Sequence, residues 1–307
     1  MNTFPSFSDP CFPRPVRGPQ KENGMGLLKR LFQPVQSITP DEAGEFMQQH
    51  REGTYTLLDV RQPGEYEQAH LPGAVLIPLP GLDSALSQLD PDKPTIVYCA
   101  IGGRSRIAAG MLTGRGFGEV YNLKGGIKAW KGLTVSGPRD LELNFITGDE
   151  TPAEIIAIAH EMEEGQKRFY MTALERTSDP DVRKVLNHLA TIEEKHKMML
   201  LDEYSRLHPH HRGPLRMNPE LIPKIMEGGL AFDDFMKSNQ TFLNSVSGLL
   251  NLAMMLEAQS LDLYLRFADT CRNKETKRLL LNIASEEKTH LEKLGELFDA
   301  ALSADTN

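Results

Sequence analysis

Four residues occur twice in the second half of the chain, in the same order and at the same spacing. Glu163, Tyr170, Glu193 and His196 recur 94 positions later as Glu257, Tyr264, Glu287 and His290. The three-residue spacing between each later Glu and its His places both side chains on one face of a helix. Four carboxylates and two imidazoles can then converge in a helical core. Burying these groups together costs free energy unless a cation compensates the negative charge. The repeat therefore predicts a helical bundle built around a two-metal site.

Helical spacing of Met, Leu, Ala, Glu and Lys runs through the same region and predicts four long helices. We expect these helices at 152–177, 180–207, about 240–271 and 274–302. A crossover at 208–238 separates the two helix pairs and carries four prolines. This connectivity is that of ferritin-like four-helix bundles, in which a Glu from two helices and Glu-x-x-His from the others hold the metals. Such ligands favour iron or manganese.

A single cysteine lies between a predicted strand and a predicted helix in the first half of the chain. The apolar run Thr95-Ile96-Val97 leads to Cys99, and Gly102-Gly103 and Arg104 follow at once. Such a turn directs backbone N–H groups and a helix N-terminus at the sulfur, and both favour an anion. We expect Cys99 to have a lowered pKa and to act as a nucleophile. The alternative for a lone cysteine is a buried small hydrophobe, and the glycines and arginines weigh against it.

Strand-like and helix-like segments alternate from Val35 to about Val135. The alternation predicts a small α/β domain with a doubly wound parallel sheet. In such sheets ligands bind at the carboxyl ends of the strands, where the Cys99 loop lies.

Four motifs of this domain resemble those of the rhodanese family: LDVRQPGEY at 58–66, HLPGA at 70–74, CAIGGR at 99–104 and GGIKAW at 125–130. The resemblance implies a central parallel sheet and transfer of sulfane sulfur through a persulfide on the loop cysteine. Phosphatases with a cysteine nucleophile are the nearest alternative, but they need C-x5-R to clamp a phosphate. Here Arg104 gives C-x4-R and Arg106 gives C-x6-R.

The chemistry assigns roles to the residues of this loop. Cys99 is the catalytic thiolate, and Arg104 orients the loop or holds an anionic donor such as thiosulfate. Backbone amides of the loop would stabilise the persulfide. The other residues expected to line or position the site are Ala100, Ile101, Gly102, Gly103, Ser105, Arg106, Asp59 and Arg61. Arg106 is equally compatible with a solvated position, and Glu65 and His70 are expected to be structural.

The helical half resembles the rubrerythrin and bacterioferritin branch of the ferritin-like superfamily. The resemblance implies two iron ions, with manganese as the alternative, held by Glu163, Glu193, His196, Glu257, Glu287 and His290. Glu193 and Glu287 would bridge the metals, and Tyr170 and Tyr264 would either donate hydrogen bonds to the ligands or fill the core. Rubrerythrins carry a further Glu ligand where this chain has Ser260, and the matching residue of the first helix is Gln166. The four-cysteine rubredoxin module is also absent from the sequence.

Composition and net charge narrow the classes of function and of partner that remain for this chain. The net charge is −8, and no basic face indicates a nucleic-acid partner. The three cysteines form no C-x-x-C pair, which suits a reducing cytoplasm. We expect no membrane span, no haem and no nucleotide. Solvated positions are expected for Glu161, Glu164, Glu194 and Glu286, and a polar loop for His208, His210 and His211.

The chain is thus expected to contain a flexible N-terminal tail (1–34), a rhodanese-like domain (35–135), a linker (136–151) and a ferritin-like di-iron bundle (152–302). We expect an enzyme in which a Cys99 persulfide is joined to a redox centre acting on dioxygen or peroxide. The alternative is an iron- or redox-sensing protein whose bundle regulates the sulfurtransferase. The expected partners are a small sulfur donor (thiosulfate or a persulfide), a thiol acceptor, an external electron donor and a second copy in a homodimer formed through the bundle.

Overall fold

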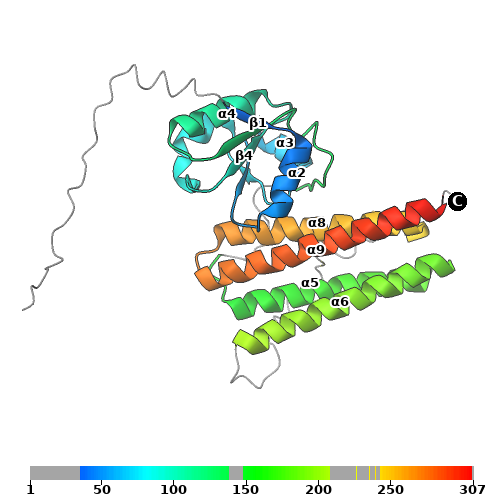
Figure 1. Cartoon of the computed structure of the whole chain (residues 1–307). Helices are drawn as coiled ribbons and strands as arrows, with labels where there is room; N and C mark the ends of the chain where they lie inside the picture. The colour runs from blue at the N-terminus through cyan, green and yellow to red at the C-terminus, as the bar shows by residue number, and fades with distance from the viewer. Residues whose placement is uncertain are drawn as a thin grey trace, which may run out of the picture.

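The computed structural model describes residues 35–137, 148–207, Met226, Phe235, Asn239 and 243–305, and the element labels follow Figure 1. The first part is a five-stranded sheet in the order β1-β5-β4-β2-β3. Its strands are β1 (Gln36–Ile38), β2 (Thr56–Asp59), β3 (Val75–Leu76), β4 (Thr95–Tyr98) and β5 (Val120–Leu123). All strand pairs of this sheet are parallel. The predicted parallel α/β fold is confirmed.

Helices cover both faces of the sheet. They are α2 (Pro40–Gln49), α3 (Pro63–Gln68) and α4 (Gly103–Gly114), with short 3-10 helices at Leu79–Ser84 and Leu86–Gln88. Successive residues of β4 point to opposite faces, so Val97 packs with the α4 side and Ile96 with the α2 and α3 side. Because both faces are covered, β4 is buried along its whole length, as is usual for a central parallel strand.

The second part consists of two helical hairpins. The first is α5 (Pro152–Arg176) with α6 (Pro180–Leu207), and the second is α8 (Val246–Thr270) with α9 (Lys274–Asp305). Thr151 caps α5 through a capping box with Glu154. The third helix begins at Val246 rather than at about 240, where the Ser245 hydroxyl accepts the N–H of Gly248 at 3.1 Å. The four predicted helices are therefore present.

Several sequence predictions concern segments outside the described residues. These are the tail (1–34), positions 138–147 of the linker, most of the crossover (208–238) and the three histidines His208, His210 and His211. Within the described ranges, no helix is long and apolar enough to cross a membrane.

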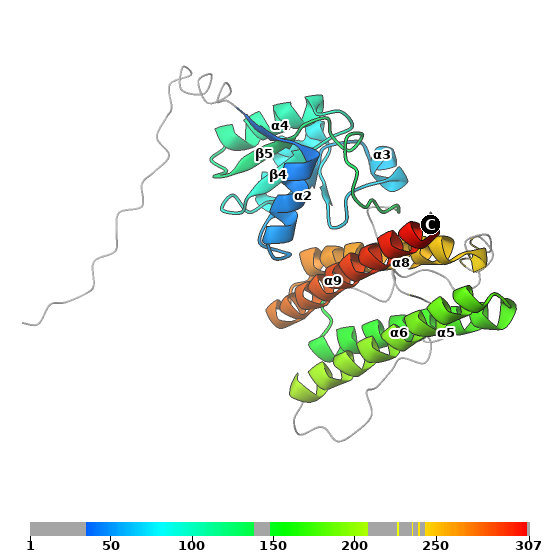
Figure 2. The same ribbon diagram turned by 45° about the vertical axis from the view of Figure 1, so that its right-hand side comes forward.

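The sheet domain packs against α8 and α9, while the α5–α6 hairpin lies on the far side of the second hairpin (Figures 1 and 2). Gly53 and Gly73 face Leu281 and Leu265 of these helices. Both glycines come just before a strand, β2 or β3, so the bundle covers the amino edge of the parallel sheet. Cys99 directly follows β4 and lies at the opposite, carboxyl edge. A four-residue strand separates the two edges by roughly 13 Å.

Candidate functional site

The Cys99 side chain lies inside the loop that joins β4 to α4. The residue is 1% exposed. The N–H of Gly102 donates to its Sγ at 3.1 Å, and the Ser105 hydroxyl lies 3.4 Å from the same atom. Since α4 begins at Gly103, the sulfur also faces a helix N-terminus. The loop therefore forms a compact anion site around one sulfur atom.

A second glycine turn fixes the direction of the loop amides. The N–H of Ile127 donates to the Cys99 carbonyl at 2.8 Å, and that of Lys128 donates to the Ala100 carbonyl at 3.1 Å. Gly126, which directly precedes Ile127, has φ +60°, and a Cβ there would lie 2.2 Å from the Cys99 oxygen. Only glycine tolerates this approach. With the carbonyls held outward, the loop N–H groups remain free to face Sγ.

The polar neighbours lower the pKa of Cys99. Burial raises the pKa of this thiol, but hydrogen bonds to the thiolate from Ser105 and from the amides of Ile101 and Gly102 outweigh it. The net pKa therefore lies below its ordinary value, as the sequence predicted. A thiol of this kind is a nucleophile near neutral pH.

Asn122 is a site residue that the sequence analysis missed. It is buried in β5, where its Oδ1 accepts from the Ser105 hydroxyl at 2.7 Å and its Nδ2 donates to Ser37 Oγ at 3.2 Å. A hydroxyl carries one proton, so Ser105 donates either to Asn122 or to the thiolate. Asn122 thus keeps Ser105 in position beside Cys99. An amide in an otherwise apolar, buried strand was the available signal.

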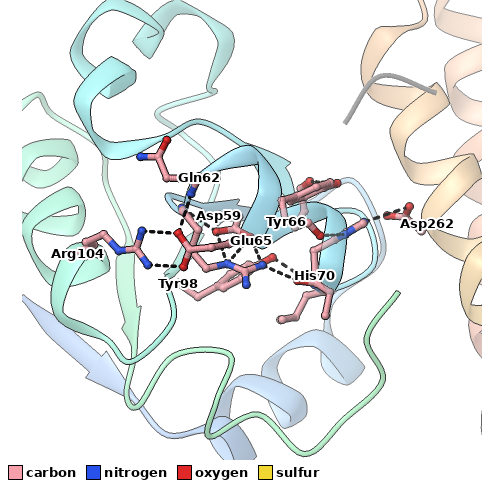
Figure 3. Close-up of polar contacts among 12 residues, drawn as sticks. Asp59, Gln62, Glu65, Tyr66, His70, Tyr98, Arg104 and Asp262 are labelled. Atoms are coloured by element: carbon pink, nitrogen blue, oxygen red, sulfur yellow. Dashed lines mark hydrogen bonds and ion pairs between the residues drawn. The ribbon is translucent and has the colours of Figure 1, made fainter. Parts of the chain in front are cut away.

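Arg104 is anchored by a carboxylate from α3. Its two terminal nitrogens donate to the two oxygens of Glu65, both at 2.7 Å (Figure 3). The hydrogen bonds from Arg104 lower the pKa of Glu65 to about 2. Arg104 is a third exposed at its side chain and keeps N–H groups for a further anion. Glu65 is structural, as expected, and its role is to hold this arginine.

The remaining predicted loop residues divide into supporting and exposed positions. Asp59 and Arg61 form a buried ion pair, and Arg61 also donates to the Ala69 carbonyl at 2.6 Å. They support the turn beneath the loop rather than reach Cys99. Ile101 is 68% exposed, and Gly103 and Arg106 are also exposed. Arg106 points into solvent from the first turn of α4, which agrees with the solvated alternative.

The six predicted metal ligands form two groups in the helical core. Each group brings one ligand atom from every member within 4.8 Å of the others: Glu163, Glu193 and His196 in the first, and Glu257, Glu287 and His290 in the second. Nδ1 of His196 lies 3.2 Å from Glu193 Oε2, and Nδ1 of His290 lies 3.4 Å from Glu287 Oε2. The two imidazole rings stack with centroids 3.8 Å apart, so the two groups adjoin.

The chemistry of this set fits two divalent cations. Four carboxylates balance two double positive charges, and two imidazoles complete a set of oxygen and nitrogen ligands. Glu193 and Glu257 are only 1% and 2% exposed, so their carboxylates are shielded from water. Burial lowers the pKa of His196, but the hydrogen bond and charge of Glu193 outweigh it and the net pKa is raised. His196 therefore compensates part of the buried carboxylate charge, and the rest calls for a cation.

The two positions that depart from the family pattern also lie in this core. Gln166 and Ser260 are completely buried, and Gln166 Nε2 donates to Glu193 Oε1 at 3.4 Å. Tyr170 and Tyr264 are buried beside the ligand helices, and the Tyr264 hydroxyl points to Met162 Sδ at 3.9 Å. Hydrogen bonds from these tyrosines to the ligands stay a prediction.

One predicted solvated carboxylate is instead buried. Glu161 is 5% exposed, because the face of α5 that carries it is covered by neighbouring side chains in the folded chain. Burial raises its pKa, and the charge of Glu164 raises it further. Glu164 and Glu194 are half-buried in ion pairs with Lys197, and Glu286 is exposed. The solvated prediction is therefore wrong for Glu161.

A cavity of about 650 Å³ between α6 and α9 leads to the candidate metal ligands. Its floor includes Glu193, His196, Glu257 and His290. Its walls are mostly apolar, and its rim carries charged side chains of both signs: Leu189, Ile192, Met199, Leu294, Leu297, Lys195, Lys293, Glu286 and Glu296. The metal ligands are thus accessible to a small molecule from the bundle side, away from the Cys99 loop.

Comparison with known proteins identifies both halves. Residues 42–133 match the model described as a Rhodanese-like domain. Over 94 residues the chain is 36% identical to thiosulfate sulfurtransferase GlpE of Pseudomonas syringae pv. syringae, and the match covers 31% of this chain and 85% of that protein. The chain belongs to the rhodanese-like family. Residues 135–204 match the Rubrerythrin model, so the rhodanese-like domain is fused to a rubrerythrin domain.

Other relatives share only the rhodanese-like half. Uncharacterized protein YqhL of Bacillus subtilis is 46% identical over 76 residues, which is 25% of this chain and 60% of that protein. The chain thus spans less than two thirds of the length of this relative. A rhodanese-related protein of Thermoplasma volcanium, known from a crystal structure, is 31% identical with a TM-score of 0.30, and the match covers 33% of this chain and 98% of that one.

Proposed function

We propose that this rhodanese-like protein is a sulfurtransferase that carries sulfur as a persulfide on Cys99, joined to a two-metal redox centre in the bundle. The observation that carries the first half is the Cys99 loop, in which an amide, a hydroxyl and a helix N-terminus all face one buried sulfur. The naming of GlpE as a thiosulfate sulfurtransferase supports thiosulfate as the donor.

The proposed transfer has two steps that balance without an outside oxidant. The Cys99 thiolate attacks the sulfane sulfur of thiosulfate, a Cys99 S–S bond forms, the donor S–S bond breaks, and sulfite leaves with the electron pair. An acceptor thiolate then attacks the terminal sulfur of the persulfide, which releases the Cys99 thiolate and yields the acceptor persulfide. The loop amides stabilise the anionic sulfur, and Arg104 holds the donor anion.

The acceptor is proposed to be a separate thiol rather than the metal centre of the same chain. Cys99 lies at the carboxyl edge of the sheet, and the bundle covers the amino edge. Consumption of thiosulfate with release of sulfite, measured with dithiothreitol as acceptor, tests this half of the proposal. Wild-type protein should turn over and Cys99→Ser should not; equal rates in both would contradict the assignment.

The bundle is proposed to hold two metal ions through the six buried residues, with iron as the first choice and manganese as the second. When bound, two iron ions would supply electron transfer to dioxygen or a peroxide. The four carboxylates and two imidazoles would hold the metals and balance their charge, and the cavity between α6 and α9 would admit the oxidant. The proposed source of electrons for this centre is a separate donor protein.

Metal analysis of anaerobically purified protein tests this second half. Two metals per chain are expected, with loss of at least one in His196→Ala. A metal-free protein that also binds no added Fe²⁺ or Mn²⁺ would overturn the assignment and leave the sulfurtransferase proposal untouched.

A further inference from the structure

A carboxylate of the bundle is buried against the sheet domain. Asp262 lies on α8 and is 3% exposed. Its Oδ1 accepts the N–H of Gly73 at 2.8 Å, and its Oδ2 lies 3.4 Å from Nε2 of His70 (Figure 3). A carboxylate is buried at such a place only when polar groups compensate its charge. Here the sheet domain supplies the Gly73 N–H, and the positively charged Arg266 has its Nε 3.5 Å from Oδ2.

His70 connects Asp262 to the carboxyl end of α3. Its ring stacks on Tyr66, with centroids 3.6 Å apart. Its Nδ1 lies 2.9 Å from the Tyr66 carbonyl, and since a carbonyl only accepts, Nδ1 donates this hydrogen bond. His70 is completely buried, so its ring has one available position between α3 and α8.

The other end of α3 holds the anion-binding arginine. Glu65 lies in the first turn of this six-residue helix and binds both terminal nitrogens of Arg104. The N–H of Gln62 donates to Glu65 Oε2 at 3.1 Å and fixes the carboxylate from behind. One short helix therefore connects His70, which contacts the bundle, with Arg104 beside Cys99.

A second set of contacts runs beneath the Cys99 loop. The N–H of Leu71 donates to the Tyr98 hydroxyl at 3.2 Å, and Arg61 donates to the Ala69 carbonyl at 2.6 Å. Tyr98 immediately precedes Cys99. The 69–73 turn, which Asp262 holds from below, therefore supports the base of the catalytic loop as well as α3.

We propose that Asp262 is a positioning residue of the sulfurtransferase site. From the helical bundle, it holds the 69–73 turn and α3 and thereby sets where Arg104 receives an anionic sulfur donor. The bundle then has a role in sulfur transfer that does not depend on passing sulfur to the metal centre. This inference rests on the proposed function of Cys99 and Arg104.

Steady-state kinetics of the full chain with thiosulfate and dithiothreitol test the inference. Asp262→Ala removes the acceptor for Gly73 and should raise the KM for thiosulfate by about three- to tenfold, since small displacements of a binding group weaken the bound geometry. The kcat should stay within about twofold, because Cys99 keeps its own amides and Ser105.

Asp262→Asn is the conservative variant. Its amide oxygen still accepts from Gly73, and its side chain keeps the size and shape that pack against His70. It should therefore restore the wild-type KM, which a nonspecific loss of packing would not predict. Asp202→Ala, at an exposed position on α6, serves as the matched control.

Circular dichroism verifies that each variant is folded. A wild-type KM in Asp262→Ala, or a KM in Asp262→Asn as high as in Asp262→Ala, would overturn the inference. If the wild-type chain shows no Cys99-dependent transfer, the proposed function itself has failed, so the two failures are distinguishable.

Discussion

Ser105 is the residue that most directly adjusts the reactivity of Cys99. It is buried, and its hydroxyl lies within reach of both Sγ and Asn122. Because hydrogen bonds to a thiolate favour the charged form, they move the onset of thiolate formation to lower pH. The chain should therefore react through Cys99 at a pH where an ordinary thiol is still protonated.

Removal of the Ser105 hydroxyl should reverse part of this shift. In Ser105→Ala the rise of iodoacetamide alkylation with pH should move to higher pH, and the rate at neutral pH should fall by about three- to tenfold. The alkylation rate of Cys99, followed by peptide mass spectrometry across pH, measures this. Cys271, at the end of α8, provides an internal control whose profile should not move. An unchanged Cys99 profile would show that Ser105 does not stabilise the thiolate.

Gly126 is a residue whose role comes from backbone geometry alone. A Cβ at this position would collide with the Cys99 carbonyl, and its φ is positive. Gly126→Ala should lower sulfurtransferase activity more than tenfold and cost on the order of 1–3 kcal/mol of stability. Gly64→Ala is the matched control, because no atom lies within 4 Å of its added methyl group. Equal activity of the two variants would contradict the account of the loop.

At the scale of elements, the 94-residue repeat is the strongest link between sequence and structure. Helical spacing predicted the four helices, and the repeat predicted that six carboxylate and imidazole side chains would gather in their core, where the structure places them in two adjoining groups. The strands of the sheet and the position of Cys99 at its carboxyl edge were also predictable, since both follow from local patterns. The contacts of Asp262 with the sheet domain were not predictable, because its partners lie 189 and 192 residues away in the chain.

For the same reason, the sequence alone did not predict that Glu161 is buried or that Glu65 anchors Arg104. Each depends on which side chains the fold brings next to a helix face, and helical periodicity does not report this for a charged residue. Asn122 was detectable as a polar residue within a buried strand, but its partner Ser105 became apparent only from the packing of α4 against β5.

The repeat predicts that metal binding depends on particular faces of α8 and α9. Glu257→Gln removes one buried negative charge from the second ligand group and should lower metal affinity by at least tenfold. Glu275→Gln, an exposed carboxylate in the first turn of α9, should bind metal like the wild type. Isothermal titration with Mn²⁺ measures both variants. Equal affinities would show that the repeated carboxylates do not hold the metal.

The repeat also explains why the sheet domain packs against the α8–α9 hairpin rather than against the α5–α6 hairpin. On α8 and α9 the docking face carries Leu265, Leu281 and Asp262. The residues 94 positions earlier on α5 and α6 are Met171, Asn187 and Arg168. Of the two described hairpins, only the second therefore has an apolar face with a carboxylate that can accept the N–H of Gly73.

Leu281→Asp should weaken the docking of the two domains, because it places a charge against Gly53 in the interface. Small-angle scattering should show a larger radius of gyration, while metal content stays unchanged. Asn187→Asp, the same change at the matching position of the first hairpin, should leave the radius unchanged. A compact Leu281→Asp chain would contradict the observed interface.

At the scale of the whole molecule, one chain holds two candidate centres. The Cys99 loop lies at one edge of the sheet, and the six candidate metal ligands lie in the bundle that covers the other edge. Fusion alone gives no reason for the two to exchange sulfur directly, and the Asp262 contact gives a mechanical reason for the domains to stay together. The domain ends at 35–135 and 152–302, and a homodimer formed through the bundle, stay predictions.

Native mass spectrometry of the anaerobically purified chain, before and after incubation with thiosulfate, tests this description most directly. We predict a chain that carries two metal ions and gains one sulfur atom. Cys99→Ser should keep the metals and gain no sulfur, whereas Glu257→Gln should gain the sulfur and lose metal. A chain that gains sulfur equally in the absence of Cys99, or that loses its metals when only Cys99 is replaced, would contradict the account.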